Sequence, residues 1–172
     1  MAALVTGAGR RIGRAMALHL AKHGFDIAVH YSGSRDGALD TVDKIRSMGR
    51  RAEAIQANFL DEDETEGLIN QAATAVGPLT VLVNNASIFE EDTLKTATQE
   101  SWDRHFKSNL RAPFVLTQEF SSQVPDANTN NEPLARGLIV NMIDQRVHKL
   151  TPQFMTYTLA KAALWTLTRT SA

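Results

Sequence analysis

Short apolar segments alternate along the chain with longer segments of helical periodicity, and this alternation limits the possible fold more than any other feature. Each apolar segment is bounded by glycine, proline or polar residues, as strands commonly are. The five predicted strands cover residues 2–5, 27–31, 52–57, 81–84 and 138–142. Strands that alternate with helices typically form a parallel sheet with helices packed on it. We therefore predict an α/β fold.

Two helices are predicted between the first three strands. The apolar stripe of the first helix consists of Ile12, Met16 and Leu20. The second covers about residues 34–48, and its predicted buried stripe is Ala38, Val42, Ile45 and Met48. Gly24 and Gly49 are predicted to end these helices, because glycine readily adopts the left-handed conformation found after a helix C-terminus.

The second half of the chain predicts three more helices. One begins in the acidic run at residues 61–64, where negative charge complements the positive end of the helix dipole. Another spans about residues 99–122 and is followed at 124–136 by a Pro-, Asn- and Asp-rich segment, typical of an exposed loop. The last begins near Thr156 and meets no stop signal before Ala172. We therefore expect the chain to be truncated at its C-terminus.

Composition narrows the possible function classes. With 172 residues, of which 43% are hydrophobic, the chain is predicted to form one domain over residues 1–172. The 18 basic and 19 acidic residues are interspersed, so the chain has no basic face for nucleic acid. Cysteine is absent, which fits a reducing compartment. No apolar run could span a bilayer and no signal peptide precedes the first strand, so we expect a soluble, cytoplasmic protein.

Metal binding is not expected. The five histidines include one helical pair, His19 and His23, but no glutamate stands beside the pair and no third ligand lies nearby in the sequence. Zinc sites of this helical type need such additional ligands. The two histidines are therefore interpreted as part of a solvated helix face.

A glycine-rich turn joins the first strand to the first helix, with the sequence TGAGRRIG at residues 6–13. Glycines allow the backbone to approach a pyrophosphate closely, and the free N–H groups of a helix N-terminus attract its negative charge. The spacing of Gly7, Gly9 and Gly13 is one residue longer than the common dinucleotide fingerprint. The turn predicts a dinucleotide site, although a turn built for shape alone is the alternative.

The end of the second strand bears on the type of dinucleotide. An NAD-binding protein usually places an acidic residue there for the ribose hydroxyls. Residues 30–35 read HYSGSR, with no carboxylate before Asp36, while Arg10, Arg11 and Arg35 are available to pair with a phosphate. This pattern favours NADP(H) over NAD(H). The alternative is that the arginines are ordinary solvated charges.

Tyr157 and Lys161 are four residues apart at the start of the last helix, so both side chains are expected on one helix face. A free phenol has a pKa near ~10. A nearby ammonium stabilises the phenolate, so that tyrosine can exchange a proton at neutral pH. This pair predicts a tyrosine proton donor, and an exposed helix pair without function is the alternative.

Taken together, the motifs resemble those of the short-chain dehydrogenase/reductase family. They are TGAGRRIG at 6–13, NNAS at 84–87, Asn109 and YTLAK at 157–161, in the family's order and spacing. The resemblance implies a Rossmann-like, doubly wound parallel sheet with helices on both faces. It also implies a homotetramer, and C-terminal strands and a substrate loop that this chain lacks.

The resemblance further implies roles for individual residues. Tyr157 would be the proton donor, Lys161 would lower its pKa and hold the nicotinamide ribose, and Asn109 would organise a proton relay. Asn58 stands where many members carry an aspartate that contacts adenine. The implied cofactor-binding residues are Gly7, Arg10, Arg11, Ile12, Gly13, His30, Tyr31, Ser32, Asn58, Phe59, Asn85, Ala86, Ser87, Tyr157 and Lys161.

Two departures from the common family pattern resemble the pteridine reductases, including dihydromonapterin-reductase-like enzymes. Arg11 replaces the middle glycine of the turn, and Asp144 replaces the usual catalytic serine. In that subgroup an aromatic residue stacks on the pterin, and Phe89 matches it. The implied substrate-binding residues are Arg11, Ser87, Phe89, Asp144 and Tyr157. Alternatively, Asp144 caps a turn at a strand end, and Phe89 is a packing residue without a role in substrate binding.

Three functions follow as hypotheses. The first is NADPH-dependent reduction of a dihydropteridine, with Tyr157 as proton donor assisted by Lys161, Asp144 and Asn109. The second is reduction of an aldehyde or ketone by a member of the same family. The third is a non-catalytic NADP(H)-binding module.

Overall fold

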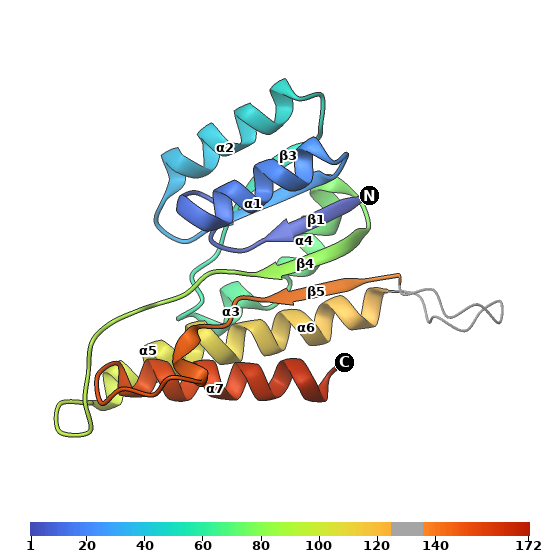
Figure 1. The fold of residues 1–172 in the computed structure, drawn as a ribbon. Coiled ribbons are helices and arrows are strands. Elements are labelled where there is room, and N and C mark those ends of the chain that lie inside the picture. Colours follow the sequence, from blue (N-terminus) through green and yellow to red (C-terminus); the bar gives the residue numbers. More distant parts are fainter. Residues whose placement is uncertain (125–135) are drawn as a thin grey trace.

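A parallel sheet of five strands forms the centre of the molecule in the computed structural model, which describes residues 1–124 and 136–172 (Figure 1). The strand order is β3-β2-β1-β4-β5, and every neighbouring pair is parallel. The strands are β1 (Ala2–Val5), β2 (Asp26–Tyr31), β3 (Ala52–Gln56), β4 (Leu79–Asn84) and β5 (Leu138–Asn141). All five predicted strands are confirmed, with edges that differ by at most two residues.

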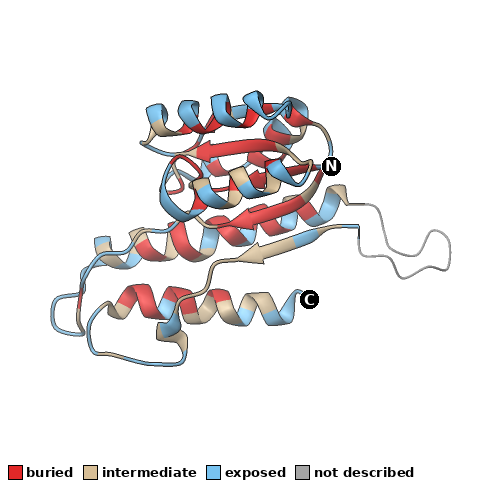
Figure 2. Ribbon diagram, turned by 45° about the horizontal axis from the view of Figure 1, so that its top comes forward, coloured by how far each residue is buried: buried red, intermediate tan, exposed pale blue. Residues whose placement is uncertain are grey.

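Helices cover both faces of this sheet, as predicted. On one face lie α1 (Arg11–Lys22) and α2 (Arg35–Ser47); on the other lie α4 (Leu68–Val76) and α6 (Ala112–Gln123). Residues of β1 alternate between the two cores, with Leu4 in one and Val5 in the other. Both faces of β1 are therefore buried (Figure 2), which explains why its sequence is continuously apolar.

The predicted buried stripes of the first two helices are partly wrong. The fully buried residues of α1 are Gly13, Ala17 and Ala21. Of the expected apolar stripe, Met16 and Leu20 are partly buried against the core, whereas Ile12 is 56% exposed. Small residues form this face because α1 begins close against the glycine turn. In α2 the stripe at Ala38, Val42 and Ile45 is buried, but Met48 follows the last helical residue and lies 37% exposed.

Gly24 and Gly49 follow α1 and α2 with φ of 92° and 76°, which confirms the predicted helix ends. The acidic run begins α3 (Glu62–Thr65), where the Asp61 side chain accepts the Asp63 N–H. This helix is a single turn, because Gly67 adopts a φ of 79° and separates it from α4.

The predicted helix at 99–122 consists of α5 (Gln99–Phe106), a π-helical segment (Lys107–Arg111) and α6. The predicted loop at 124–136 lies outside the described residues except at its two ends. The last helix, α7 (Met155–Thr170), begins within one residue of the prediction and packs against α5 and the π-helical segment. None of the described helices is long and apolar enough to cross a membrane.

The strand order reverses at β1, which pairs with β2 on one side and β4 on the other. Chains that leave adjacent parallel strands toward opposite faces open a crevice at the carboxyl ends of those strands. The predicted motifs at 6–13 and 84–87 both lie at these ends. The topology therefore brings the sequence motifs to one edge of the sheet.

Candidate active site

Thr6 anchors the glycine turn to the end of β4. Its hydroxyl donates to the Val83 carbonyl at 3.2 Å and accepts the N–H groups of Asn85 and Ala86, each at 2.9 Å. The Asn85 amide donates back to the Thr6 carbonyl at 2.8 Å. Residues about 80 positions apart in sequence are thus held together. These hydrogen bonds join the turn to the segment after β4 at the carboxyl ends of β1 and β4.

Glycine is required inside this turn because there is no room for a side chain. A Cβ at Gly13 would lie 2.3 Å from the Gly7 carbonyl oxygen and 2.4 Å from the Asn85 side-chain nitrogen. Among the described residues, none caps the α1 N-terminus with its side chain, and the first turn of α1 contains no acidic residue. Its free N–H groups and dipole can therefore hold an anion.

Three arginines surround the turn without carboxylate partners. Arg10, Arg11 and Arg35 are exposed, and within residues 1–124 and 136–172 none lies within 4.0 Å of an acidic oxygen. Arg14, by contrast, pairs with Asp40. Arg11 has a φ of 50°, a conformation that favours the glycine it replaces. The three guanidinium groups remain available to a phosphate.

The buried His30 side chain holds the glycine turn through a hydrogen bond to its backbone. Its Nδ1 accepts the Gly7 N–H at 3.0 Å, so the neutral ring carries its proton on Nε2, which donates to the Ala57 carbonyl at 3.0 Å. Phe59 stacks on the ring at 4.4 Å. Both side chains are buried, and the His30 ring supports the glycine turn; the cofactor contact of these two residues stays a prediction.

Because His30 is buried, it is expected to make the stability of the folded protein sensitive to acid. Desolvation lowers the pKa of His30 from 6.5 to about 4, so the unfolded chain binds more protons between these values. Stability should therefore fall as pH falls through this window, by about 2 kcal/mol between pH 7 and 4.5. Urea unfolding at the two pH values measures the loss. The loss should shrink in His30→Asn and persist in His19→Asn, an exposed-site control; equal losses would contradict the assignment.

Tyr157 and Lys161 are both buried, which rules out an exposed pair. The Tyr157 hydroxyl donates to Asp144 Oδ2 at 3.1 Å, and Lys161 Nζ donates to the Met142 carbonyl at 2.8 Å. Burial, followed by the charge and hydrogen bond of Asp144, raises the pKa of Tyr157. Burial lowers the pKa of Lys161 to about 8. The shift of the Tyr157 pKa is opposite to the lowering expected from Lys161, because burial and the neighbouring Asp144 carboxylate disfavour the phenolate, so the phenol keeps its proton at neutral pH.

Asp144 caps a turn, as the alternative interpretation expected, and its side chain also contacts Tyr157. Oδ1 accepts the Arg146 N–H at 2.8 Å and caps the short 3₁₀ turn Gln145–Val147, while Oδ2 faces Tyr157. Asn109 lies fully buried in the π-helical segment, and its amide forms two hydrogen bonds with the backbone of Ile88, at 2.8 and 2.9 Å. Its side chain therefore fixes the segment after β4.

Phe89 is half exposed beside Tyr157 and belongs to an aromatic cluster. Its ring stacks on Phe154 at 4.2 Å and meets the Tyr157 ring edge-on at 4.7 Å. The Arg146 guanidinium lies 4.6 Å from the Phe154 ring centre and 5.4 Å from that of Phe89. Phe154 and Arg146 were not predicted, because no linear motif marks residues that meet Phe89 only through the fold.

The remaining predicted site residues occupy the same edge of the sheet. Tyr31 ends β2 and Ser32 follows it, and Ser87 is exposed after β4. Asn58 is less available, because its side-chain oxygen accepts the Leu60 N–H at 3.2 Å. Among the described residues, no group of three or more histidine and acidic side chains could hold a metal ion.

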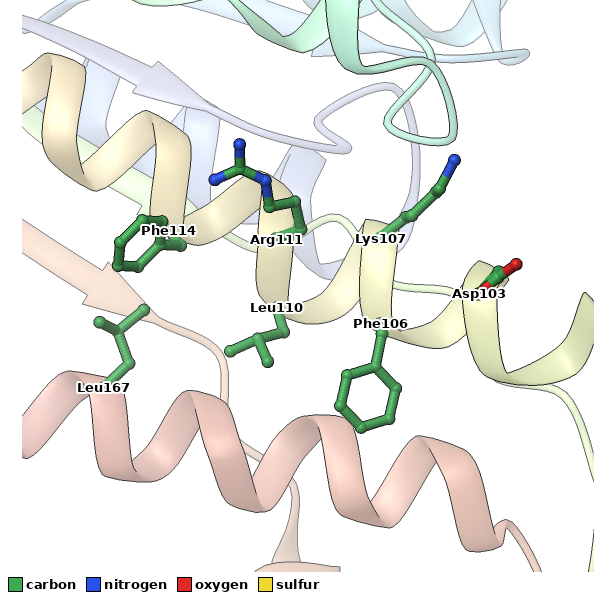
Figure 3. Close-up of a pocket in the computed structure, with 7 residues that line it drawn as sticks. All are labelled: Asp103, Phe106, Lys107, Leu110, Arg111, Phe114 and Leu167. Atoms are coloured by element: carbon green, nitrogen blue, oxygen red, sulfur yellow. The ribbon is translucent and has the colours of Figure 1, made fainter. Parts of the chain in front are cut away.

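A groove of about 440 Å³ lies elsewhere, on the surface between the π-helical segment and α7 (Figure 3). The side chains of Phe106, at the end of α5, and Leu110, in the π-helical segment, point toward α7, and Leu167 of α7 faces them. None of its lining residues belongs to the cluster around Tyr157. The groove is thus an apolar surface separate from the candidate chemistry.

Comparisons with known proteins agree with this arrangement. Residues 1–172 match the short chain dehydrogenase family model. The 3-oxoacyl-acyl-carrier-protein reductase FabG of Staphylococcus epidermidis is 35% identical over 99% of this chain and 67% of its own length. The chain spans about two thirds of the length of such relatives.

Two solved structures of similar proteins were determined with bound NADP. FolM alternative dihydrofolate reductase 1 from Brucella suis, in complex with NADP, is 42% identical, with a TM-score of 0.90 over 99% of this chain and 68% of that one. The landomycin C-6 ketoreductase LanV, with bound NADP and rabelomycin, is 32% identical, with a TM-score of 0.83 over 96% of this chain and 66% of that one.

Proposed function

The chain belongs to the short-chain dehydrogenase family, and from that premise we propose that it carries the cofactor-binding and catalytic part of an NADPH-dependent dihydropteridine reductase. The observation that carries the proposal is the contact between Asp144 and Tyr157, with Phe89 beside them. A simple carbonyl reduction has no need of a carboxylate there, whereas a pterin offers ring nitrogens that need hydrogen-bonding partners.

NADP(H) is the proposed cofactor. The glycine turn and the α1 N-terminus would hold the pyrophosphate, and the arginines without carboxylate partners would favour a 2′-phosphate. The FolM and LanV structures, both solved with NADP, support this choice. When bound, NADPH supplies the hydride to an electrophilic carbon of the substrate.

The residues of this chain would supply the proton and the orientation. Tyr157 would donate its phenolic proton to the substrate nitrogen as that nitrogen gains electron density. Asp144 would orient the phenol and bond the amino-bearing edge of the pterin, and Phe89 would stack on its flat face. Lys161 would hold the nicotinamide ribose, and Asn109 would keep the segment after β4 in place.

We also propose a domain organisation, a cellular location and an oligomeric state for the protein. Residues 1–172 would form a single domain, and the protein would act in the cytoplasm as a homotetramer. The apolar groove in Figure 3 supports association, because exposed apolar surface of this kind commonly marks a contact between proteins.

Carbonyl reduction is the second candidate function, and the FabG and LanV relatives favour it. The test follows NADPH consumption by the purified chain with a dihydropteridine, with a simple ketone, and with NADH in place of NADPH. The pteridine proposal expects turnover only with NADPH and the dihydropteridine. Turnover with the ketone alone would favour the second candidate, and NADPH binding without any turnover would contradict both for this chain.

Substitution of Asp144 separates the two functions further. Asp144→Ser should lower pteridine turnover about a hundredfold, because the substrate loses a carboxylate partner and the phenol loses its orientation. Ketone turnover, if present, should be kept or improved. The kcat and KM for each substrate measure the difference, and the exposed Asp43→Ser serves as the matched control. Undiminished pteridine turnover in Asp144→Ser would contradict the role of Asp144.

A further inference from the structure

A buried polar network adjoins Tyr157 and takes no direct part in the proposed proton transfer. It consists of Asp92 after β4, His105 in α5 and Thr156 in α7, and these side chains are 4%, 0% and 1% exposed. Thr156 is 64 positions from Asp92 and 51 from His105. Helices α5 and α7 lie side by side (Figure 1), so the network joins elements that only the fold brings together.

The hydrogen bonds of this network have a defined direction. The Glu90 N–H donates to His105 Nε2 at 3.1 Å, so the neutral ring carries its proton on Nδ1. That N–H donates to the Thr156 hydroxyl at 2.7 Å, and the hydroxyl donates to Asp92 Oδ2 at 2.5 Å. The direction of each hydrogen bond is therefore fixed, and the Thr156 hydroxyl links the histidine to the carboxylate.

The charges of the network agree with this direction. Burial lowers the pKa of His105, which keeps the ring neutral. Burial of Asp92 would by itself raise its pKa, but hydrogen bonds from Thr156 and Ser101 outweigh this effect and hold the pKa of Asp92 below its ordinary value. A neutral histidine and an ionised aspartate are the states that the chain of donors requires.

Asp92 also supplies the missing cap of α7. Phe154 precedes the helix in a left-handed conformation and gives no side-chain cap. Instead, the Asp92 carboxylate accepts the Thr156 N–H at 3.0 Å, and its backbone carbonyl accepts the Met155 N–H at 3.2 Å. A carboxylate at a helix N-terminus also interacts favourably with the helix dipole. The first turn of α7 is thereby fixed immediately before Tyr157.

We infer that Asp92, Thr156 and His105 are positioning residues that hold the Tyr157 phenol in its orientation toward Asp144. The Tyr157 ring follows Thr156 in the chain and meets the His105 ring edge-on at 6.0 Å, so movement of the network displaces the phenol. This inference rests on the proposed function of Tyr157 as proton donor. Small displacements of a reacting group are costly, because a shift of about 1 Å can reduce rates on the order of a hundredfold.

Thr156→Val tests the inference, because it removes the hydroxyl and keeps the branched shape and the N–H bond to Asp92. We expect kcat to fall about tenfold or more, with the KM for NADPH within about twofold of wild type. Thr156→Ser keeps the hydroxyl and should restore kcat. Thr158→Val is the matched control, since Thr158 is a buried threonine of the same helix whose hydroxyl has no hydrogen-bond partner within residues 1–124 and 136–172.

A second measurement does not depend on activity. Incorporated fluorotyrosine gives one ¹⁹F NMR signal for Tyr157 and one for Tyr31, the two tyrosines of the chain. In Thr156→Val the Tyr157 signal should broaden or split while the Tyr31 signal stays sharp; in Thr156→Ser and Thr158→Val both should stay sharp. A sharp Tyr157 signal in Thr156→Val, or a kcat that falls only with the folded fraction, would overturn the inference. Absence of pteridine turnover in wild type would instead reject the proposed function.

Discussion

Replacement of Tyr157 with phenylalanine is expected to lower pteridine turnover on the order of a thousandfold and to spare NADPH binding. The change removes one oxygen and keeps the ring that packs against Phe89 and His105. The proton donor is lost, whereas the glycine turn that would hold the cofactor pyrophosphate is not altered by the substitution. A loss in kcat without a loss in affinity is the signature of an interaction made in the transition state.

Steady-state kinetics with a dihydropteridine and NADPH fluorescence titration measure the two quantities separately. Thermal unfolding of the variant serves as the control for folding, because the substitution removes the hydroxyl's contact with Asp144 and keeps the ring. Unchanged turnover in Tyr157→Phe would reject the role of the tyrosine. A weakened affinity for NADPH with normal kcat would place Tyr157 in binding rather than in proton transfer.

Gly13→Ala is expected to cause the largest loss of stability and cofactor binding among single substitutions in the turn. The new Cβ would lie 2.3 Å from a backbone carbonyl oxygen, which cannot move without displacing Gly7. Overpacking of this kind costs about 3 kcal/mol. The displaced turn would also point its N–H groups away from a pyrophosphate, so NADPH affinity should fall about tenfold or more.

Urea unfolding and NADPH titration check this prediction. Gly33→Ala is the matched control, because a Cβ at Gly33 would meet nothing within 4 Å in the described part of the chain and the residue does not have a positive φ. It should unfold within about 0.5 kcal/mol of wild type. Equal stability of Gly13→Ala and Gly33→Ala would contradict the close packing of the turn.

The fold could be predicted largely from local patterns. Strands buried on both faces read as continuous apolar runs, and the left-handed glycines at 24 and 49 mark helix ends. Patterns of large apolar residues were less informative for the face of α1, where Ile12 is exposed and Gly13 is buried. Periodicity cannot identify such a face when close approach to the sheet selects small residues over large ones.

The sequence by itself determined the order of the elements, the glycine turn and the placement of Tyr157 and Lys161 on one helix face, because these depend on spacing within a few residues. Only the tertiary structure decided that Asp144 meets Tyr157, that His30 supports Gly7, and that Asp92 caps α7. These contacts join residues that are 13, 23 and 64 positions apart. Burial then set the direction of each pKa shift in His30, Tyr157 and Lys161, and no local pattern encodes burial.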